Sequence, residues 1–101
     1  MTDLADISLD VILARLNEIA PELRARGVTG LSLFGSRARG DARPDSDLDV
    51  LVETSQAPSF DYFKVLHLIE QATGLQVQIS QRKLLKPRLA ERIADDLIEV
   101  F

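Results

Sequence analysis

Apolar side chains recur at helical spacing near the start of the chain. From residue 7 to residue 26 they return every three or four positions, and charged residues occupy the opposite face. Pro21 interrupts the pattern, which predicts either a kink or two helical pieces with Pro21 opening the second. Gly27 is typical of the residue that ends a helix. The apolar face comprises Leu9, Ile12, Leu13, Leu16, Ile19, Ala20 and Leu23.

Later segments have the pattern of strands. Val28–Phe34 carries apolar residues on both faces, as a central strand does. Asp47–Glu53 alternates between acidic and apolar positions at its start, which predicts a strand with one polar end. Leu75–Ser80 alternates apolar and polar side chains in the same way. Leu97–Phe101 fits either a short fourth strand or an apolar tail.

Two further helices complete the pattern. Phe60–Thr73 predicts a helix that ends at Gly74, and Pro87 starts a last helix that runs to about Asp95. Residues 35–46 predict a turn or short helix followed by a loop. This order of elements fits a small α+β fold, with a sheet of three to four strands and helices packed mainly on one face. The inward side of the middle helix is expected to consist of Phe60, Phe63, Leu66, Ile69 and Ala72.

The composition limits the classes of protein that the chain can represent. Its 101 residues suffice for one domain, which we expect to span residues 1–101. No apolar stretch approaches the ~20 residues that a membrane span needs, and no basic leader precedes an apolar run at the N-terminus. The chain has no cysteine, which excludes disulfide and thiolate chemistry and favours a cytoplasmic protein. Its net charge of −4 argues against tight non-specific binding of nucleic acid.

The segment from residue 34 to residue 52 carries the candidate chemistry. Asp47 and Asp49 lie two residues apart on a predicted strand, so both carboxylates project from the same face. They repel each other unless a cation lies between them, and hard oxygen ligands select Mg²⁺ or Mn²⁺. Gly35-Ser36 ends the preceding strand, where backbone amides and a hydroxyl can bind phosphate oxygens. The combination favours a nucleoside triphosphate site, although either motif alone is more often a solvated loop or a cap.

In this segment the sequence resembles a known family. Gly35-Ser36, ten further residues and then Asp47-x-Asp49 resemble the signature of the polymerase-beta-like nucleotidyltransferases. The fuller string at residues 34–49, Phe-Gly-Ser-Arg-Ala-Arg-Gly-Asp-Ala-Arg-Pro-Asp-Ser-Asp-Leu-Asp, is similar to that of the minimal nucleotidyltransferases, the MNT proteins. The resemblance extends over nearly the whole chain. It implies the polymerase-beta-like nucleotidyltransferase fold, with a small mixed sheet.

The resemblance also implies a reaction and assigns residues to it. Gly35 and Ser36, with Arg37 beside them, would bind the triphosphate, and Asp47 and Asp49 would be the catalytic residues that hold Mg²⁺ or Mn²⁺. MNT proteins are the antitoxins of HEPN-domain toxins. The resemblance therefore implies ATP as donor and a tyrosine of a HEPN toxin as acceptor, which the added AMP silences. Two metal ions stabilise the attacking and leaving oxygens in such an in-line displacement.

One position departs from the family pattern. The family carries a third carboxylate on the next strand, and this sequence has Gln78 at the corresponding place. A neutral amide cannot act as a general base and is a poor magnesium ligand. Two hypotheses therefore stay open: an antitoxin that adenylylates its partner, and a catalytically impaired homologue that neutralises the partner by binding. A third, adenylylation of a small molecule such as an antibiotic, is disfavoured because the chain is too short to build an acceptor pocket.

Charged residues between the two halves of the motif allow two interpretations. Arg37, Arg39 and Arg43 either contact phosphates or pair with Asp41 and Asp45 on a charged loop. The two interpretations are about equally favoured, and Arg37 is the best phosphate candidate because it adjoins Ser36. Asp41 and Asp45 are interpreted as braces of the loop, because they fall outside the Asp-x-Asp pair.

Residues outside the motif carry weaker signals. The basic residues between positions 82 and 92 either dock a partner or form a solvated helix face, and the second interpretation is favoured. The single histidine, His67, is interpreted as a helix residue without a catalytic role. The aromatic residues of segment 60–63 are interpreted as core or interface. Val100 and Phe101 are expected to be exposed, which would make a homo-oligomer possible.

Overall fold

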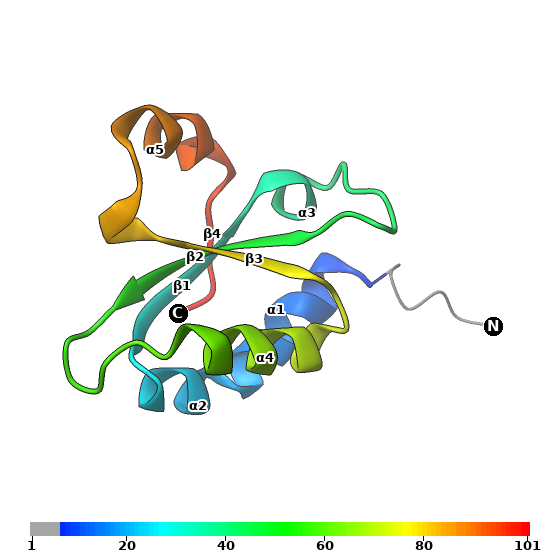
Figure 1. Ribbon diagram of the computed structural model, residues 1–101. Helices are drawn as coiled ribbons and strands as arrows, with labels where there is room; N and C mark the ends of the chain where they lie inside the picture. The colour runs from blue at the N-terminus through cyan, green and yellow to red at the C-terminus, as the bar shows by residue number, and fades with distance from the viewer. Residues whose placement is uncertain (1–6) are drawn as a thin grey trace.

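A mixed four-stranded sheet organises the chain in the computed structural model, which describes residues 7–101 (Figure 1). Its strands are β1 (Val28–Phe34), β2 (Leu48–Thr54), β3 (Val77–Gln81) and β4 (Ile98–Glu99), in the order β3-β2-β1-β4. Strand β1 pairs antiparallel with β2 and with β4, whereas β2 and β3 are parallel. A parallel pair needs a crossover, and helix α4 (Tyr62–Thr73) supplies it. The expected α+β class with a small mixed sheet is confirmed.

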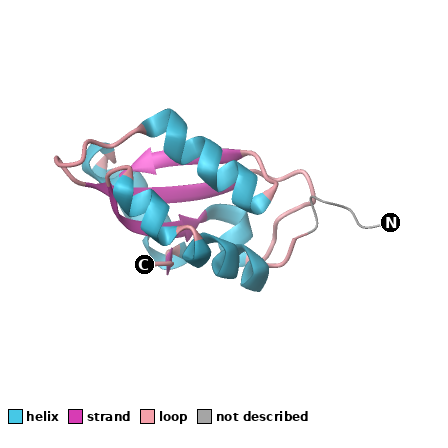
Figure 2. Ribbon diagram, turned by 90° about the horizontal axis from the view of Figure 1, so that it is seen from below, coloured by secondary structure: helices cyan, strands magenta, loops and turns pink. Residues whose placement is uncertain are grey.

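Helices cover both faces of this sheet unequally. Helices α1 (Leu9–Glu18), α2 (Ala20–Ala25) and α4 lie across one face, which Figure 2 shows from the helix side. The other face carries α3 (Gly35–Arg39) and α5 (Pro87–Ile93) (Figure 1). Two 3₁₀ turns, η1 (Arg82–Leu84) and η2 (Ala94–Asp96), flank α5. None of the helices within residues 7–101 is long and apolar enough to cross a membrane.

The predicted interruption at Pro21 separates α1 from α2. Helix α1 starts at a cap, where the Ser8 hydroxyl accepts a hydrogen bond from the Val11 amide at 3.3 Å. Pro21 is the second residue of α2, where its missing N–H leaves no helical hydrogen bond unmade. Gly27 then adopts a φ of +92°, and a Cβ there would lie 2.6 Å from the backbone of Phe60. Two helical pieces and a glycine stop are therefore confirmed.

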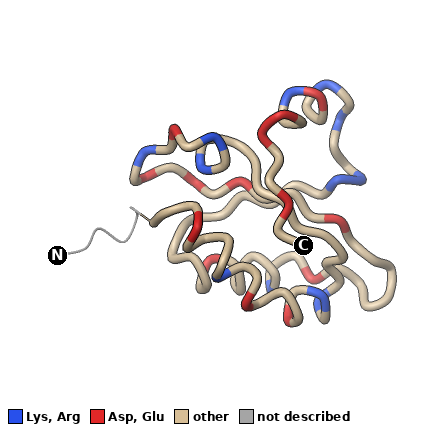
Figure 3. The backbone as a smooth tube through the Cα atoms, turned by 180° about the vertical axis from the view of Figure 1, so that it is seen from behind, with Lys and Arg blue, Asp and Glu red and all other residues tan. Residues whose placement is uncertain are grey.

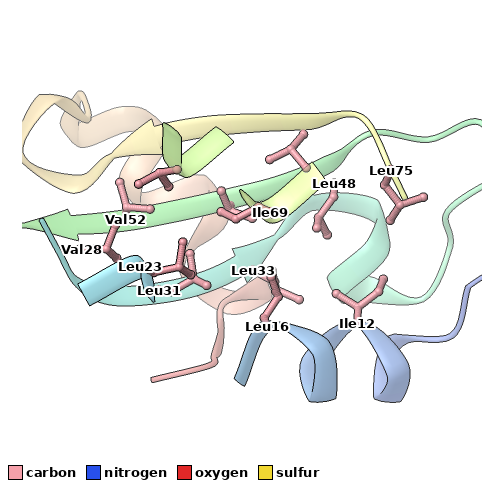
Figure 4. Close-up of a cluster of buried hydrophobic side chains, with 13 residues drawn as sticks. Ile12, Leu16, Leu23, Val28, Leu31, Leu33, Leu48, Val52, Ile69 and Leu75 are labelled. Carbon is pink, nitrogen blue, oxygen red and sulfur yellow. The ribbon is translucent and has the colours of Figure 1, made fainter. Parts of the chain in front are cut away.

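The hydrophobic core fills the space between the sheet and the three helices (Figure 4). Alternate residues of β2 point into it, so Leu48, Val50 and Val52 are fully buried. The same alternation places Asp49 on the opposite face, toward α3. Helix α3 in turn contacts β1, β2 and η2. The core thus fixes the strands whose other face carries the polar motif.

The inward face predicted for the middle helix is wrong at Phe63. This ring is 78% exposed, and the buried side chains of α4 are Val65, Ile69 and Thr73. The helix begins only at Tyr62, because the Asp61 carboxylate caps it by accepting from the Lys64 amide. Phe63 precedes Ile69 by six residues, which on an α-helix is about 240° and turns it away from the sheet.

The end of the chain is also packed differently from the expectation. Val100 and Phe101 are half-buried against the core, because the Val100 amide donates to the Leu31 carbonyl and the Leu31 amide donates to the Phe101 carbonyl. The guanidinium of Arg24 lies 4.6 Å from the centre of the Phe101 ring. The short fourth strand is confirmed, and the expected exposure of these two residues is wrong.

Candidate functional site

Strand pairing brings the two halves of the polar motif together. In the antiparallel register of β1 and β2, Phe34 lies opposite Asp49. Gly35 and Ser36 follow Phe34 directly and form the first turn of α3. Asp47 directly precedes β2, because the strand begins at Leu48, one residue after the predicted start. The glycine, the serine and both acids therefore meet at one end of the β1–β2 pair.

Gly35 is required by its contact with Asp49. Its φ is +78°, and a Cβ at this position would lie 2.3 Å from Oδ2 of Asp49. The space that a side chain would need is taken by the carboxylate. The glycine thus allows Asp49 to lie against the start of α3, a function in addition to the backbone access for phosphate that the sequence suggests.

The Ser36 side chain is available at the same place. Its carbonyl accepts hydrogen bonds from the amides of Gly40 and Asp41, which closes the short helix. Within residues 7–101 its hydroxyl makes no hydrogen bond, so it can donate to an added ligand.

Gln78 completes the polar cluster from the third strand. In the parallel register of β2 and β3 it lies opposite Asp49, and its Nε2 donates to Oδ2 of Asp47 at 2.9 Å. The side chain is otherwise exposed. The position expected for a third carboxylate is therefore adjacent to both acids, and it holds an amide that donates to one of them.

The charge of Asp49 is destabilised at this position. Burial, together with the nearby Asp47 carboxylate, raises the pKa of Asp49 above its ordinary value, and Arg39 partly opposes this rise. Within residues 7–101 no group of three or more His, Cys, Asp or Glu side chains is arranged to hold a metal ion. The site therefore offers two carboxylates, and a bound cation would relieve their repulsion. Figure 3 shows the acidic segments along this loop and the start of β2.

The sequence matches a known protein family. A family model described as the nucleotidyltransferase domain matches residues 14–100. The chain belongs to this nucleotidyltransferase family. Its resemblance to the minimal nucleotidyltransferases is thereby confirmed, and the relatives below agree with it.

Relatives of this nucleotidyltransferase include proteins that match nearly all of the chain. The protein adenylyltransferase MntA of Thermococcus cleftensis is 32% identical over 99 residues, which are 96% of this chain and 100% of that protein. A solved structure provisionally assigned as a minimal nucleotidyltransferase superimposes with a TM-score of 0.78 at 30% identity, covering 92% of this chain and 96% of that one. A chain from the complex of tri-AMPylated Shewanella oneidensis HEPN toxin with MNT antitoxin has the same fold, with a TM-score of 0.61 at 17% identity, covering 89% and 71%.

The donor set of the candidate site fits a hard divalent cation. Mg²⁺ is commonly held by one or two carboxylates together with substrate phosphates, rather than by a cage of protein ligands. Asp47 and Asp49 are two such carboxylates, and neither forms an ion pair among the described residues. The Gln78 amide donates a hydrogen bond to Asp47, so it contributes no negative charge to the ligand set.

Arg37 holds the loop that leads to the two acids. It is only 7% exposed, and its guanidinium donates to the Ser46 carbonyl at 3.0 and 3.3 Å and to the Pro44 carbonyl at 3.2 Å. A charged donor on two loop carbonyls stabilises the conformation that presents Asp47. The sequence suggested only phosphate or carboxylate partners for this arginine, because carbonyl partners leave no pattern in the side chains.

Arg39 links the site to the end of the chain. Its guanidinium bonds Asp41 at 3.1 Å and Asp96, on η2, at 2.9 Å. The expected pairing with Asp41 is confirmed. The contact with Asp96 was not expected, since 57 residues separate the two and no local spacing indicates it. This ion pair ties α3 to η2 on the face that carries the site.

Asp49→Asn is expected to stabilise the nucleotidyltransferase when no divalent cation is present. The raised pKa means that ionised Asp49 lowers the free energy of unfolding at neutral pH. Asp49→Asn should therefore have a higher free energy of unfolding than the unsubstituted protein. This difference should be full above the raised pKa, shrink as the pH falls through it, and vanish below the ordinary pKa of 3.8. Thermal unfolding in EDTA across this pH range measures the effect.

The matched control is Asp45→Asn, which changes an exposed acid of the same loop. It should leave the melting temperature within about 1 °C, as surface substitutions generally do. Mg²⁺ should raise the melting temperature of the unsubstituted protein and have little effect on Asp49→Asn. If the melting temperatures of Asp49→Asn and the unsubstituted protein changed equally with EDTA and pH, the repulsion assigned to Asp47 and Asp49 would be contradicted.

Proposed function

We propose that this nucleotidyltransferase transfers AMP from Mg-ATP to a tyrosine of a HEPN toxin and thereby acts as its antitoxin. The observation that carries the proposal is the Asp47–Asp49 pair, with Asp49 packed against Gly35 where the β1–β2 register ends. Support comes from full-length similarity to a protein adenylyltransferase and from the shared fold with a chain of an AMPylated toxin–antitoxin complex.

Each residue of the site has an assigned task. Asp47 and Asp49 hold Mg²⁺, or Mn²⁺, and the Gly35 backbone and the Ser36 hydroxyl bind the triphosphate. Arg37 contributes through the loop, since its guanidinium is engaged by the Pro44 and Ser46 carbonyls. A cation held by these carboxylates would supply positive charge beside the phosphate oxygens.

The acceptor chemistry follows from the neutral Gln78. The acceptor oxygen forms a bond to the α-phosphorus, the bond from that phosphorus to the bridging oxygen breaks, and pyrophosphate leaves. The acceptor proton is released to solvent water. Gln78 cannot take it, so an acceptor that ionises easily is favoured. A tyrosine phenol, with a pKa of about 10, meets this need better than an aliphatic hydroxyl.

Transfer is tested by incubating the purified protein with Mg²⁺, its HEPN partner and ATP labelled on the α-phosphate. The partner should become labelled and gain the mass of AMP on a tyrosine. ATP labelled on the γ-phosphate is the control, and it should label nothing. Label from the γ-phosphate, or none from the α-phosphate, would contradict the proposal.

An alternative function is neutralisation by binding alone. The amide at Gln78, where the family carries an acid, favours it, because a neutral amide cannot accept the acceptor proton as a carboxylate at this position could. In that case the partner would stay unlabelled and would still be inhibited in a stable complex with this chain. The same incubation therefore separates the two candidate functions.

Gln78→Asp is expected to raise the rate of transfer by about tenfold or more, since a positioned general base contributes at least that much. Side-chain reach is tested with Gln78→Glu, which keeps the length of glutamine. Initial rates at saturating ATP measure the gain. An unchanged rate in both variants would show that an acid at this position does not assist the reaction.

A further inference from the structure

An apolar groove lies beyond the site, at the far end of β3. It has a volume of about 390 Å³ and is bounded by the strand, by η1 and by the first turns of α5. Two of its apolar side chains are unusually exposed for leucine, with Leu84 at 70% and Leu89 at 38%. Its lining consists of Ile79, Ser80, Gln81, Leu84, Leu85, Lys86 and Leu89.

Positive charge is concentrated in the segment that bounds one side of this groove. Residues 82–92 contain five basic residues and a single acid, although the whole chain has a net charge of −4. Within residues 7–101 only Arg82 among the five lies near a carboxylate, that of Glu53 at 3.7 Å. The blue segments of η1 and α5 stand together in Figure 3. Unpaired cations beside exposed leucines are a surface suited to apolar side chains flanked by acids.

The groove is close to the candidate site at Asp47 and Asp49. Gln78 lies beside Asp47 and Asp49, and Ser80 of the groove follows it two residues later, which is about 6–7 Å along a strand. On the other side, α3 flanks the site, whereas β3 is an edge strand of the sheet that residues 7–101 form. A protein acceptor that reaches the site past β3 would lie across this groove.

We propose that the groove docks an acidic amphipathic segment of the acceptor protein. Apolar residues of that segment would pack on Leu84 and Leu89, and its carboxylates would pair with Lys83, Lys86 and neighbouring cations. This inference rests on the proposed function for the identity of the partner. Docking at the groove would raise the effective concentration of the acceptor tyrosine at the two acids.

The test measures affinity first, in the absence of ATP, so that it does not depend on transfer. Leu84→Glu should weaken the complex with the HEPN partner by about tenfold or more, since it places a carboxylate in an apolar contact surrounded by the partner's acids. Lys83→Glu with Lys86→Glu should slow association and reduce the dependence of affinity on salt. Where transfer occurs, Leu84→Glu should raise KM for the partner and leave the binding of Mg-ATP unchanged.

The matched control is Phe63→Glu, which changes an equally exposed apolar residue on α4, across the sheet. Phe63→Glu should leave the affinity for the HEPN partner unchanged. Loss of affinity in Phe63→Glu with full affinity in Leu84→Glu would overturn the proposal and assign the partner to α4. The proposal would also be overturned if the lysine variants lost affinity for single-stranded RNA but not for the HEPN partner. The same holds if Leu84→Glu abolished self-association of this chain and left the affinity for the partner unchanged. Failure of transfer with the expected affinity losses would count against the proposed function, not against the groove.

Discussion

Asp47→Asn and Asp49→Asn are each expected to lower the rate of adenylyl transfer by about a thousandfold, equivalent to roughly 4 kcal/mol of transition-state stabilisation. Each variant removes one of the two negative charges that the site offers to a cation, and the described residues supply no third acid in their place. The adjacent Gln78 amide cannot compensate, since it carries no charge. Single-turnover rates with α-labelled ATP and the partner measure the loss.

Asp45→Asn provides the matched control for these two variants. It removes a carboxylate from the same loop, two residues before Asp47, where the side chain is exposed and forms no ion pair among the described residues. Its transfer rate should stay within about twofold of the unsubstituted protein, as expected for a surface substitution. Comparable losses in all three variants would mean that loop charge in general, and not the pair, supports the reaction.

Gly35→Ala is expected to reduce transfer by about a hundredfold, because a displacement of about 1 Å at a reacting group has an effect of this size. The added Cβ would lie 2.3 Å from Oδ2 of Asp49, so the carboxylate or the start of α3 must move. The φ of +78° adds a conformational cost of about 1–2 kcal/mol for alanine. The variant should therefore also melt at a lower temperature.

Gly40→Ala separates the clash from the conformational cost. Gly40 has a φ of +88° and ends the same short helix, but a Cβ there would meet nothing within 4 Å. It should lose similar stability through its backbone and retain transfer within a few-fold. The pair of variants is compared by thermal unfolding and by transfer rate at a temperature where both are folded. Equal loss of transfer would contradict the importance of the Gly35–Asp49 contact.

The elements of the fold were largely predictable from local patterns. Strand β1 has the predicted bounds, and the break at Pro21 and the stop at Gly27 follow from backbone chemistry at single residues. Phe63 shows where the pattern failed. A few apolar residues on a helix fit more than one face, and the cap at Asp61 and the position of the sheet decided which face is buried.

The candidate site was likewise predictable in part. Sequence spacing was sufficient to group Gly35, Ser36, Asp47 and Asp49, since strand alternation puts both acids on one face. The resemblance to the family indicated Gln78 as the residue beside them, and the parallel register of β2 and β3 pairs it with Asp49. The partners of Arg37 and Arg39 were not predictable, because loop carbonyls and a residue 57 positions away leave no local signal.

By itself, the sequence determined the order of the elements, the polar motif and its family, since these depend on residues a few positions apart. The tertiary structure alone decided that Gly35 makes room for a carboxylate, that an amide donates to Asp47, and that leucines and cations surround a groove beyond them. The physical reason is that such contacts arise from strand register and chain packing, which join residues remote in sequence and are fixed only when the core closes.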